Sequence, residues 1–368
     1  MESTDEVKSL SPKITLGRYV YEDIYPAFKA ATNEKQITAR INCTFLNYLA
    51  ADDLVLSGSH PAVVADIGCG PCDTLIRYLT GVSFPPGFLV RATDFIPKYA
   101  DSERGEAVKT LMTAQMEQVI KLVTFETRAG DAFASNLLDL LSASKDRQTM
   151  RQAFNIVFVS HVIYHADAYS DVQRMLTDVA DNLLARDGLC ILYHIANTPR
   201  TFQDFRARFG GSAGIVAHSD TGAVTIDDPP AQIRVACDGQ RLPLYEASFK
   251  TTLSFGPVRD DEWRAFADPS AYDRLAVANP AAYEDLKRLY FVVQRAPLDF
   301  AADYSPSGLN CFVSEIREVI ESNNGVLPLA ERIQVFTRRD ANPVLANTIP
   351  EALAVSVTSA PDDLRANT

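Results

Sequence analysis

Residues 62–73 read Ala-Val-Val-Ala-Asp-Ile-Gly-Cys-Gly-Pro-Cys-Asp, and this stretch decides the fold. Its first six residues form a short apolar run typical of a buried strand, and Gly68 and Gly70 follow at once. Glycine lets the backbone turn tightly and lets a ligand approach the main chain. A helical pattern then runs from Asp73 to Leu79, so its N-terminus presents unpaired N–H groups and a partial positive charge. The stretch predicts a strand–turn–helix unit with a ligand site at the turn.

The turn lacks one feature of a dinucleotide-binding fingerprint. Asp73 stands where that fingerprint carries its third glycine. A carboxylate there would repel a pyrophosphate, whereas it suits a ligand with a cationic amino group. We therefore expect Asp73 to contribute to the ligand site.

Strand-like and helical patterns alternate along the next 130 or so residues, as βαβ units do. This alternation predicts a mostly parallel sheet with right-handed crossovers. Beyond residue 197 this regular alternation of strands and helices ends. We expect a loop at 210–230, a strand at 244–255 and helices at 260–267, 280–296 and 312–322. The remaining strands are expected at 88–93, 123–127, 154–159, 189–195 and 332–337, with an amphipathic helix over 171–184.

Acidic residues mark the ends of the first three strands. Asp94 ends the second strand at the distance from the glycine turn at which an acid accepts hydrogen bonds from ribose hydroxyls. Asp131 follows the third strand and is placed to meet an adenine edge, with Ala132 and Phe133 beside the ring. Together with Asp66, these acids are expected to converge on one nucleoside at the carboxyl edge of the sheet.

At this point the sequence resembles the class I S-adenosylmethionine-dependent methyltransferases. Residues 65–74 (ADIGCGPCDT) look like the family's first motif, 93–95 like its ribose acid and 129–133 like its adenine-contacting acid. Residues 154–166 and 182–196 look like its fourth motif and fifth strand. The resemblance implies an α/β fold with a Rossmann-like, mostly parallel, seven-stranded methyltransferase sheet and S-adenosylmethionine as cofactor, with Ser160 as a further contact.

A finer resemblance, to histamine N-methyltransferase and its relatives, covers residues 17–36, 161–165 and 194–210. It implies that the N-terminal helical segment covers the site and that Glu34 binds the substrate. The family carries a glutamine and a Tyr-Tyr pair where this chain has His161, Tyr164 and His165. Its C-terminal amide falls near Glu331, and that role is not carried over.

These residues suggest how an amine acceptor would be handled. Glu34 could hold the cationic form, and His161 or His165 could relay its proton, since histidine titrates near neutrality. Tyr164 and Tyr25 could stack over a cation or the adenine. We expect transfer of a methyl group to a nitrogen of a small amine or amino-acid-like metabolite. An oxygen or carboxyl acceptor, and a non-catalytic cofactor- or partner-binding module, remain open as alternatives.

The chain length of 368 residues predicts about two domains at roughly 150 residues each. We expect a cofactor-binding core flanked by segments that shape the acceptor pocket. The expected parts are an N-terminal helical cap at 1–55, the core at 56–200, an insertion with C-terminal helices at 201–330, a returning core strand at 331–340 and a polar tail at 341–368.

Composition restricts the partners. Lys and Arg total 35 against 47 Asp and Glu, a net charge of −12, so we expect no nucleic-acid partner. No apolar run reaches the roughly 18 residues of a membrane span, and Met1–Lys13 lacks the apolar core of a secretory signal. We therefore expect a cytoplasmic protein without a membrane partner.

The six cysteines are scattered, several of them in apolar runs, which indicates reduced thiols. Cys69 and Cys72 form a C-x-x-C between a strand and a helix, so a thioredoxin-like redox site is a formal alternative. It lacks the preceding tryptophan and leaves the later strand acids unexplained. No second cysteine pair completes a zinc site, and no third ligand accompanies His161 and His165, so we expect no metal.

Overall fold

The fold is seen in a computed structural model of the chain. The residues that the structure describes are 21–142, 146–163, 166, 168–209, 216–219, 222–225, 229–257, 269–293 and 306–360. As far as these residues go, the chain forms two compact units. The core unit comprises Asn33–Asn197, Gly214–Thr251 and Ala330–Thr368, and the second unit comprises Met1–Thr32, Thr198–Ala213 and Thr252–Leu329.

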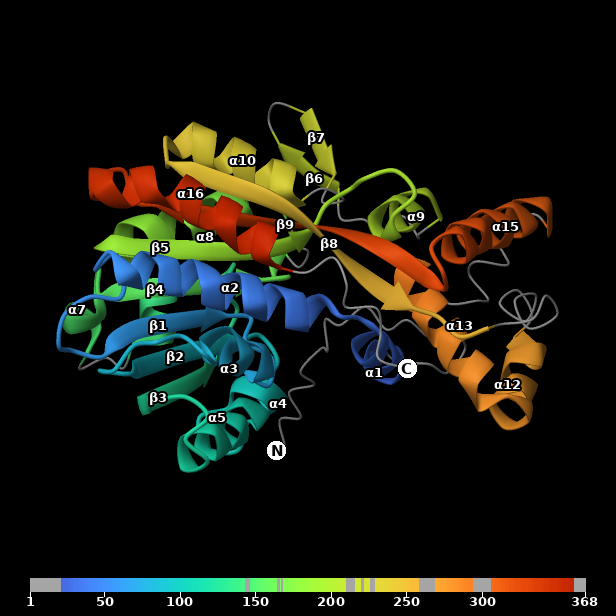
Figure 1. Cartoon of the computed structure of the whole chain (residues 1–368), viewed down its shortest axis with the longest axis horizontal. Helices are drawn as coiled ribbons and strands as arrows, with labels where there is room; N and C mark the ends of the chain where they lie inside the picture. The colour runs from blue at the N-terminus through green and yellow to red at the C-terminus, as the bar shows by residue number, and fades with distance from the viewer. Residues whose placement is uncertain are drawn as a thin grey trace, which may run out of the picture. The chain divides into compact units, whose positions relative to one another are not determined.

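A seven-stranded sheet organises the core unit, with strand order β3-β2-β1-β4-β5-β9-β8 (Figure 1). The strands from β1 to β5 pair in parallel, and β9 runs antiparallel to β5. The predicted α/β fold with a mostly parallel, seven-stranded, Rossmann-like sheet is confirmed. The strands are β1 (Ala62–Ile67), β2 (Phe88–Asp94), β3 (Leu122–Ala129), β4 (Phe154–Ser160), β5 (Leu184–Ile195), β8 (Leu244–Ser254) and β9 (Val326–Thr337).

The strand order places a topological switch between β1 and β4. The chain leaves β1 towards β2 and β3 on one side and returns to β4 and β5 on the other, so the loops after β1 and β4 diverge at the carboxyl edge. In open parallel sheets, ligands bind at this edge and at this switch point.

Helices cover both faces of the sheet. Figure 1 shows α2 and α16, in blue and red, side by side over one face, where they pack on each other. On the other face α8 packs against α10. The helices of this unit are α2 (Glu34–Ala51), α3 (Asp73–Leu79), α4 (Pro97–Ala100), α5 (Glu106–Met116), α6 (Leu137–Leu141), α7 (Arg147–Met150), α8 (Tyr169–Asp178), the π-helical turn η2 (Val179–Leu183), α10 (Pro229–Gln240) and α16 (Pro343–Ser359).

The second unit is built around aromatic side chains. The rings of Phe28 and Phe291 stack with centroids 4.2 Å apart, and Phe202 lies 5.8 Å from Phe28. Its helices are α1 (Tyr21–Ala31), α9 (Phe202–Phe209), α12 (Pro269–Ala278), α13 (Pro280–Val293) and α15 (Pro306–Ser322).

Three predicted elements differ from the structure. The stretch read as a polar tail forms α16, because Leu345, Ile349 and Leu353 recur at helical spacing and are buried. The predicted loop at 210–230 contains the paired strands β6 (Val216–Ser219) and β7 (Gly222–Thr225) and the start of α10. The helix predicted over 171–184 ends sooner, in η2, and β5 begins at Leu184. The helix predicted at 260–267 lies outside the described residues, and the domain boundaries stay a prediction.

Candidate functional site

The two glycines of the turn after β1 differ in their surroundings. Val162 fills the space beside Gly68, whereas the space beside Gly70 is open among the described residues. Both residues adopt left-handed backbone conformations, with φ of +73° and +49°, which favour glycine. A Cβ on Gly68 would lie 2.3 Å from Cγ2 of Val162, so packing requires a glycine there. At Gly70, no heavy atom of the described residues lies within 4 Å of the equivalent position. A ligand can therefore approach the main chain at Gly70.

Hydrogen bonds tie the ends of β1, β2 and β3 together. The N–H of Gly68 donates to the carbonyl of Thr93 at 2.8 Å, and the N–H of Gly130 donates to the carbonyl of Asp94 at 2.9 Å. Oδ2 of Asp94 accepts the N–H of Gly70 at 2.8 Å. Asp94 thus fixes the open turn and links all three strand ends.

Asp131 shapes the loop after β3. Its Oδ1 accepts the backbone N–H groups of Phe133 at 2.8 Å and Ala134 at 3.2 Å. These bonds close a local turn that places Ala132, half-buried, directly after Asp131. The structure therefore brings Asp131 and Ala132 to the same edge as Asp94, since Gly130 is bonded to Asp94.

Asp66 lies near the end of β1 and is 5% exposed. Burial, and then the charge of Asp94, raise the pKa of its carboxyl to about 7. Asp66 therefore titrates close to neutral pH.

Two further predicted cofactor residues contact protein groups. Nζ of Lys35 lies 3.5 Å from both carboxylate oxygens of Asp73 and donates to Oγ1 of Thr74 at 2.6 Å. The hydroxyls of Ser160 and Tyr78 lie 3.3 Å apart. The cofactor contacts of Asp73 and Ser160 stay predictions. The Lys35 contact also joins the first turn of α2 to the first turn of α3, directly after the glycine turn.

A buried ion pair lies where β4 ends. Nε2 of His161 is 2.8 Å from Oε1 of Glu34, whose side chain is 8% exposed, while that of His161 is 28% exposed. Burial by itself would raise the pKa of Glu34, but the charge and hydrogen bond of His161 hold that pKa below its usual value. Burial would lower the pKa of His161, and Glu34 raises it on balance. Both pKa shifts therefore favour the ionised form of the pair, and His161 is its more accessible member.

The backbone of His161 is unusual. Its φ is +56°, a conformation that few residues other than glycine adopt and that clusters at functional sites. Its N–H donates to the carbonyl of Tyr193 on β5 at 3.0 Å. The next residue, Val162, packs on Gly68. This strained turn therefore joins the His161 pair to the glycine turn.

Glu331 on β9 lies in the neighbourhood of this pair. Its side chain is 1% exposed, and its Oε1 accepts the hydroxyl of Thr251 on β8 at 3.2 Å. Burial, and then the charge of Glu34, raise the pKa of Glu331 to about 8. Glu331 therefore keeps its proton at neutral pH, in contrast to Glu34.

His194 on β5 is fully buried, and its ring centroid lies 6.1 Å from that of His161. Burial lowers the pKa of His194 well below its usual range, and the charge of His161 acts in the same direction. His194 is therefore a neutral neighbour of the ion pair.

Other predicted site residues lie elsewhere. Tyr164 and His165 fall outside the described residues. Tyr25 belongs to the second unit, where its ring lies 5.8 Å from that of Phe291. The substrate role of Tyr25 stays a prediction, as do the roles of Tyr164 and His165.

The sequence resemblance pointed to the neighbourhood of Glu331, but no role was carried over to it. Leu329, Glu331 and Ile333 alternate along β9, and all three are buried. A glutamate at an inward position of an alternating strand was the available signal. The contact between Lys35 and Asp73 had no comparable signal, because it joins two helices that are distant in the sequence.

The cysteines of the glycine turn do not have the properties of a redox pair. Cys69 and Cys72 are both free and buried. Hydrogen bonding to Cys72 and burial raise the pKa of Cys69 well above its usual value. For Cys72, the hydrogen bond with Cys69 is the largest influence and lowers the pKa, but burial together with the charges of nearby aspartates raises the pKa on balance. Reactive thiols of the thioredoxin type have lowered pKa values, so the geometry opposes that alternative.

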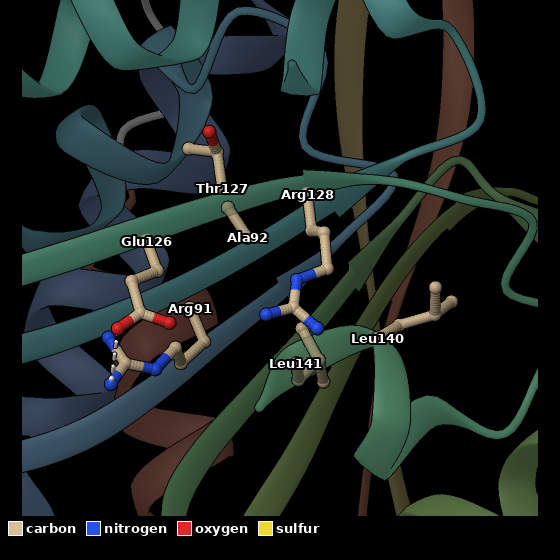
Figure 2. A pocket seen from close by; sticks show the side chains of 7 residues that line it. All are labelled: Arg91, Ala92, Glu126, Thr127, Arg128, Leu140 and Leu141. Carbon is tan, nitrogen blue, oxygen red and sulfur yellow. Dashed lines mark ion pairs between the residues drawn. The ribbon is translucent and has the colours of Figure 1, made fainter. Parts of the chain in front are cut away.

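A small pocket lies elsewhere on the sheet (Figure 2). Arg91 and Glu126 are register partners in the middle of β2 and β3, and they form an ion pair at 3.3 Å. Arg128 donates to the backbone carbonyls of Asp139 at 3.0 Å and Ser142 at 2.8 Å. These groups are engaged with the protein itself, and the pocket is structural.

Within the residues that the structure describes, no helix is both long and apolar enough to cross a membrane.

Neither a protein-family model nor a curated protein matches the sequence. Among solved structures, a cyclopropane-fatty-acyl-phospholipid synthase-like protein from Lactobacillus casei is 15% identical, with a TM-score of 0.40, over 86% of this chain and 99% of that one. The plantazolicin methyltransferase BamL, solved with S-adenosylhomocysteine, is 9% identical, with a TM-score of 0.38, over 86% and 91%.

Phosphoethanolamine N-methyltransferase 2 of Haemonchus contortus, solved with phosphomonomethylethanolamine and S-adenosylhomocysteine, is 11% identical, with a TM-score of 0.34, over 79% of this chain and 52% of that one. At this level of similarity the assignment of the fold rests on the strand order and register of this chain.

Proposed function

We propose that the chain is an S-adenosylmethionine-dependent methyltransferase that acts on a nitrogen of a small cationic amine or amino-acid-like metabolite. One observation carries the proposal. The carboxyl edge of the sheet combines an open glycine turn, fixed by Asp94, with the buried ion pair of Glu34 and His161. Lys35 and Val162 connect the two features directly.

The residues at the glycine turn suit a nucleoside with a cationic tail. A carboxylate has about four lone-pair directions, so Asp94 can hold Gly70 and accept ribose hydroxyls at the same time. Asp131 and Ala132 would meet the adenine. Asp66 and Asp73 supply negative charge for the amino group of the methionine moiety. When bound, S-adenosylmethionine supplies an electrophilic methyl group on a sulfonium.

The ion pair suits an acceptor that arrives with a proton. An amine must lose that proton before its lone pair can attack, and its position relative to the methyl group determines much of the rate. Once His161 has released its own proton, its imidazole can accept one from the acceptor as a general base. Glu34 keeps its charge and orients the imidazole throughout.

An oxygen acceptor is the second candidate, because a neutral His161 could also deprotonate a hydroxyl. A carboxylate acceptor is disfavoured, since the ionised Glu34 would repel it. The non-catalytic alternative predicts that the cofactor binds without turnover.

The proposal is tested by incubating the full chain with methyl-labelled S-adenosylmethionine and matched pairs of small amines and alcohols of equal size. Label in an amine product, lost in His161→Ala and kept in the exposed control variant Asp187→Ala, supports the proposal. Label only in alcohols would transfer the assignment to oxygen. Binding of S-adenosylhomocysteine without any labelled product would identify a binding module.

A further inference from the structure

The two carboxyl groups beside His161 differ in their surroundings. Glu34 has the imidazole of His161 at 2.8 Å, so its charge is balanced. Glu331 has one hydrogen bond, from Thr251, and its Oε2 has no hydrogen-bond partner among the described residues. A buried carboxylate with so little compensation is costly, so a carboxyl group in this position keeps its proton.

Among the residues that the structure describes, the groups around Glu331 provide no second cation for it. From α2 come Glu34 and Lys35, and Lys35 is engaged with Asp73. His161, from the turn after β4, is already paired with Glu34. On β8 the neighbour is the neutral hydroxyl of Thr251.

Among the described residues, those on the strands next to Glu331 supply no positive charge to it either. The register partner of Glu331 on β5 is the apolar Ile195. His194 is neutral, and alternation along β5 directs it to the opposite face of the sheet. Arg332, next to Glu331 on β9, also lies on that opposite face, where it pairs with Glu246 at 3.4 Å. Among the described residues, the cluster of Glu34, His161 and Glu331 is thus neutral overall and holds two protons.

We propose that Glu331 belongs to the acceptor site and exchanges its proton for the positive charge of the acceptor. This inference rests on the proposed function. A cation that enters beside the ion pair supplies the charge that Glu331 lacks, and Glu331 ionises. One O–H bond of the Glu331 carboxyl breaks, and its proton leaves to solvent. The site then selects cations over neutral molecules of the same shape, because only a cation stabilises the ionised Glu331.

The proposal is tested on the full chain saturated with S-adenosylhomocysteine, with tetramethylammonium and benzyltrimethylammonium as probes. These ions keep their charge at every pH, so any pH dependence of binding belongs to the protein. The affinity of the wild type should rise about tenfold from pH 6 to pH 7 and level off above about pH 8, with close to one proton released per cation at pH 6.5. Calorimetry in two buffers of different ionisation enthalpy measures the proton release.

Three variants determine the outcome. Glu331→Gln should remove the pH dependence and the proton release, whereas the exposed control Glu117→Gln should keep both. Thr251→Val keeps the carboxyl group of Glu331 but removes its hydrogen-bond donor. The pH at which the cation affinity levels off should therefore rise. This variant provides the test if Glu331→Gln does not fold. Failure of both cations to bind, or a pH dependence that persists in Glu331→Gln, would overturn the inference.

The two proposals fail separately. If S-adenosylhomocysteine does not bind, the proposed function fails. If it binds and the cations do not, the role of Glu331 fails while the cofactor assignment stands.

Discussion

Nε2 of His161 lies 2.8 Å from Oε1 of Glu34, so the end of β4 is joined to the first turn of α2 by a buried ion pair. The backbone of His161 is left-handed, with a φ of +56°. The pair is next to the glycine turn, because Val162 packs on Gly68 and Lys35 contacts Asp73. The geometry therefore connects the proposed acceptor side to the glycine turn.

Replacing Glu34 by Gln should weaken the binding of a cationic acceptor and leave the cofactor unaffected. A hydrogen bond to a charged group contributes roughly 1.5–3 kcal/mol, so the KM for an amine should rise roughly ten- to hundredfold. Steady-state kinetics with the amine found in the labelling assay, alongside calorimetry of S-adenosylhomocysteine, measures both effects. Glu321→Gln, on an exposed side chain, is the control. An unchanged KM would remove Glu34 from the acceptor site.

The two glycines of the turn should respond differently to alanine. Gly68→Ala introduces a 2.3 Å clash with Val162 and should lower the melting temperature by several degrees. Gly70→Ala meets only the strain of a positive φ, about 1 kcal/mol, but its methyl group occupies the open side of the turn. Its affinity for S-adenosylhomocysteine should fall at least about tenfold, a loss of about 1.4 kcal/mol. Equal cofactor affinity in Gly70→Ala and the wild type would argue against a ligand at this turn.

Cofactor binding should depend on pH through Asp66. Its carboxyl has a pKa of about 7, and a cationic amino group prefers the ionised form. Affinity for S-adenosylhomocysteine should therefore increase as the pH rises through 7, by up to about tenfold per unit below that value. Asp66→Asn should flatten the profile measured by calorimetry between pH 5.5 and pH 8.5. A wild-type profile that falls over this range would contradict the prediction.

Glu331 should also make stability depend on pH. Its pKa in the folded protein, about 8, is above the usual value of 4.5, so the folded state binds the extra proton between these values. Stability therefore decreases as the pH rises from about 4.5 to about 8. Glu331→Gln should show a shallower decrease in melting temperature than the wild type over pH 5–9. Asp66 and Asp285 also have raised pKa values, but they are common to both proteins, so the difference isolates Glu331.

Helix α16 should contribute substantially to the core. Leu353 is 2% exposed and Val355 on the same helix is 39% exposed. Leu353→Ala should lower the free energy of unfolding by about 2–5 kcal/mol, and Val355→Ala by much less. Denaturant titrations compare the two variants directly. Equal losses would mean that α16 does not pack as described.

The sheet and its ligand edge could be predicted because their signals are local. Each parallel strand is a short apolar run, and Asp94 and Asp131 stand directly at strand ends. The helix α16 was missed because residues 341–368 were read by their overall composition, which hid the helical spacing of Leu345, Ile349 and Leu353. Its capping residue Asn342, which accepts the N–H of Val344, was a signal that composition alone does not reveal.

The acceptor side could be predicted only in part. Glu34 and His161 came from a resemblance, and their ion pair depends on how α2 packs against the sheet, which no spacing encodes. Glu331 lies near the ion pair because β9 pairs antiparallel with β5 and places it opposite Ile195. That register is a long-range property, so the burial of Glu331 and the rise in its pKa could not be derived from its neighbours in the sequence.

The most direct test of the account is calorimetry of S-adenosylhomocysteine binding to the full chain and to two aspartate variants. We predict a single site in the wild type, the loss of that site in Asp94→Ala, and unchanged binding in the control Asp187→Ala, whose side chain is exposed. No binding at millimolar S-adenosylhomocysteine, or equally tight binding by Asp94→Ala, would contradict the assignment of the glycine turn and the acids at the strand ends to this cofactor.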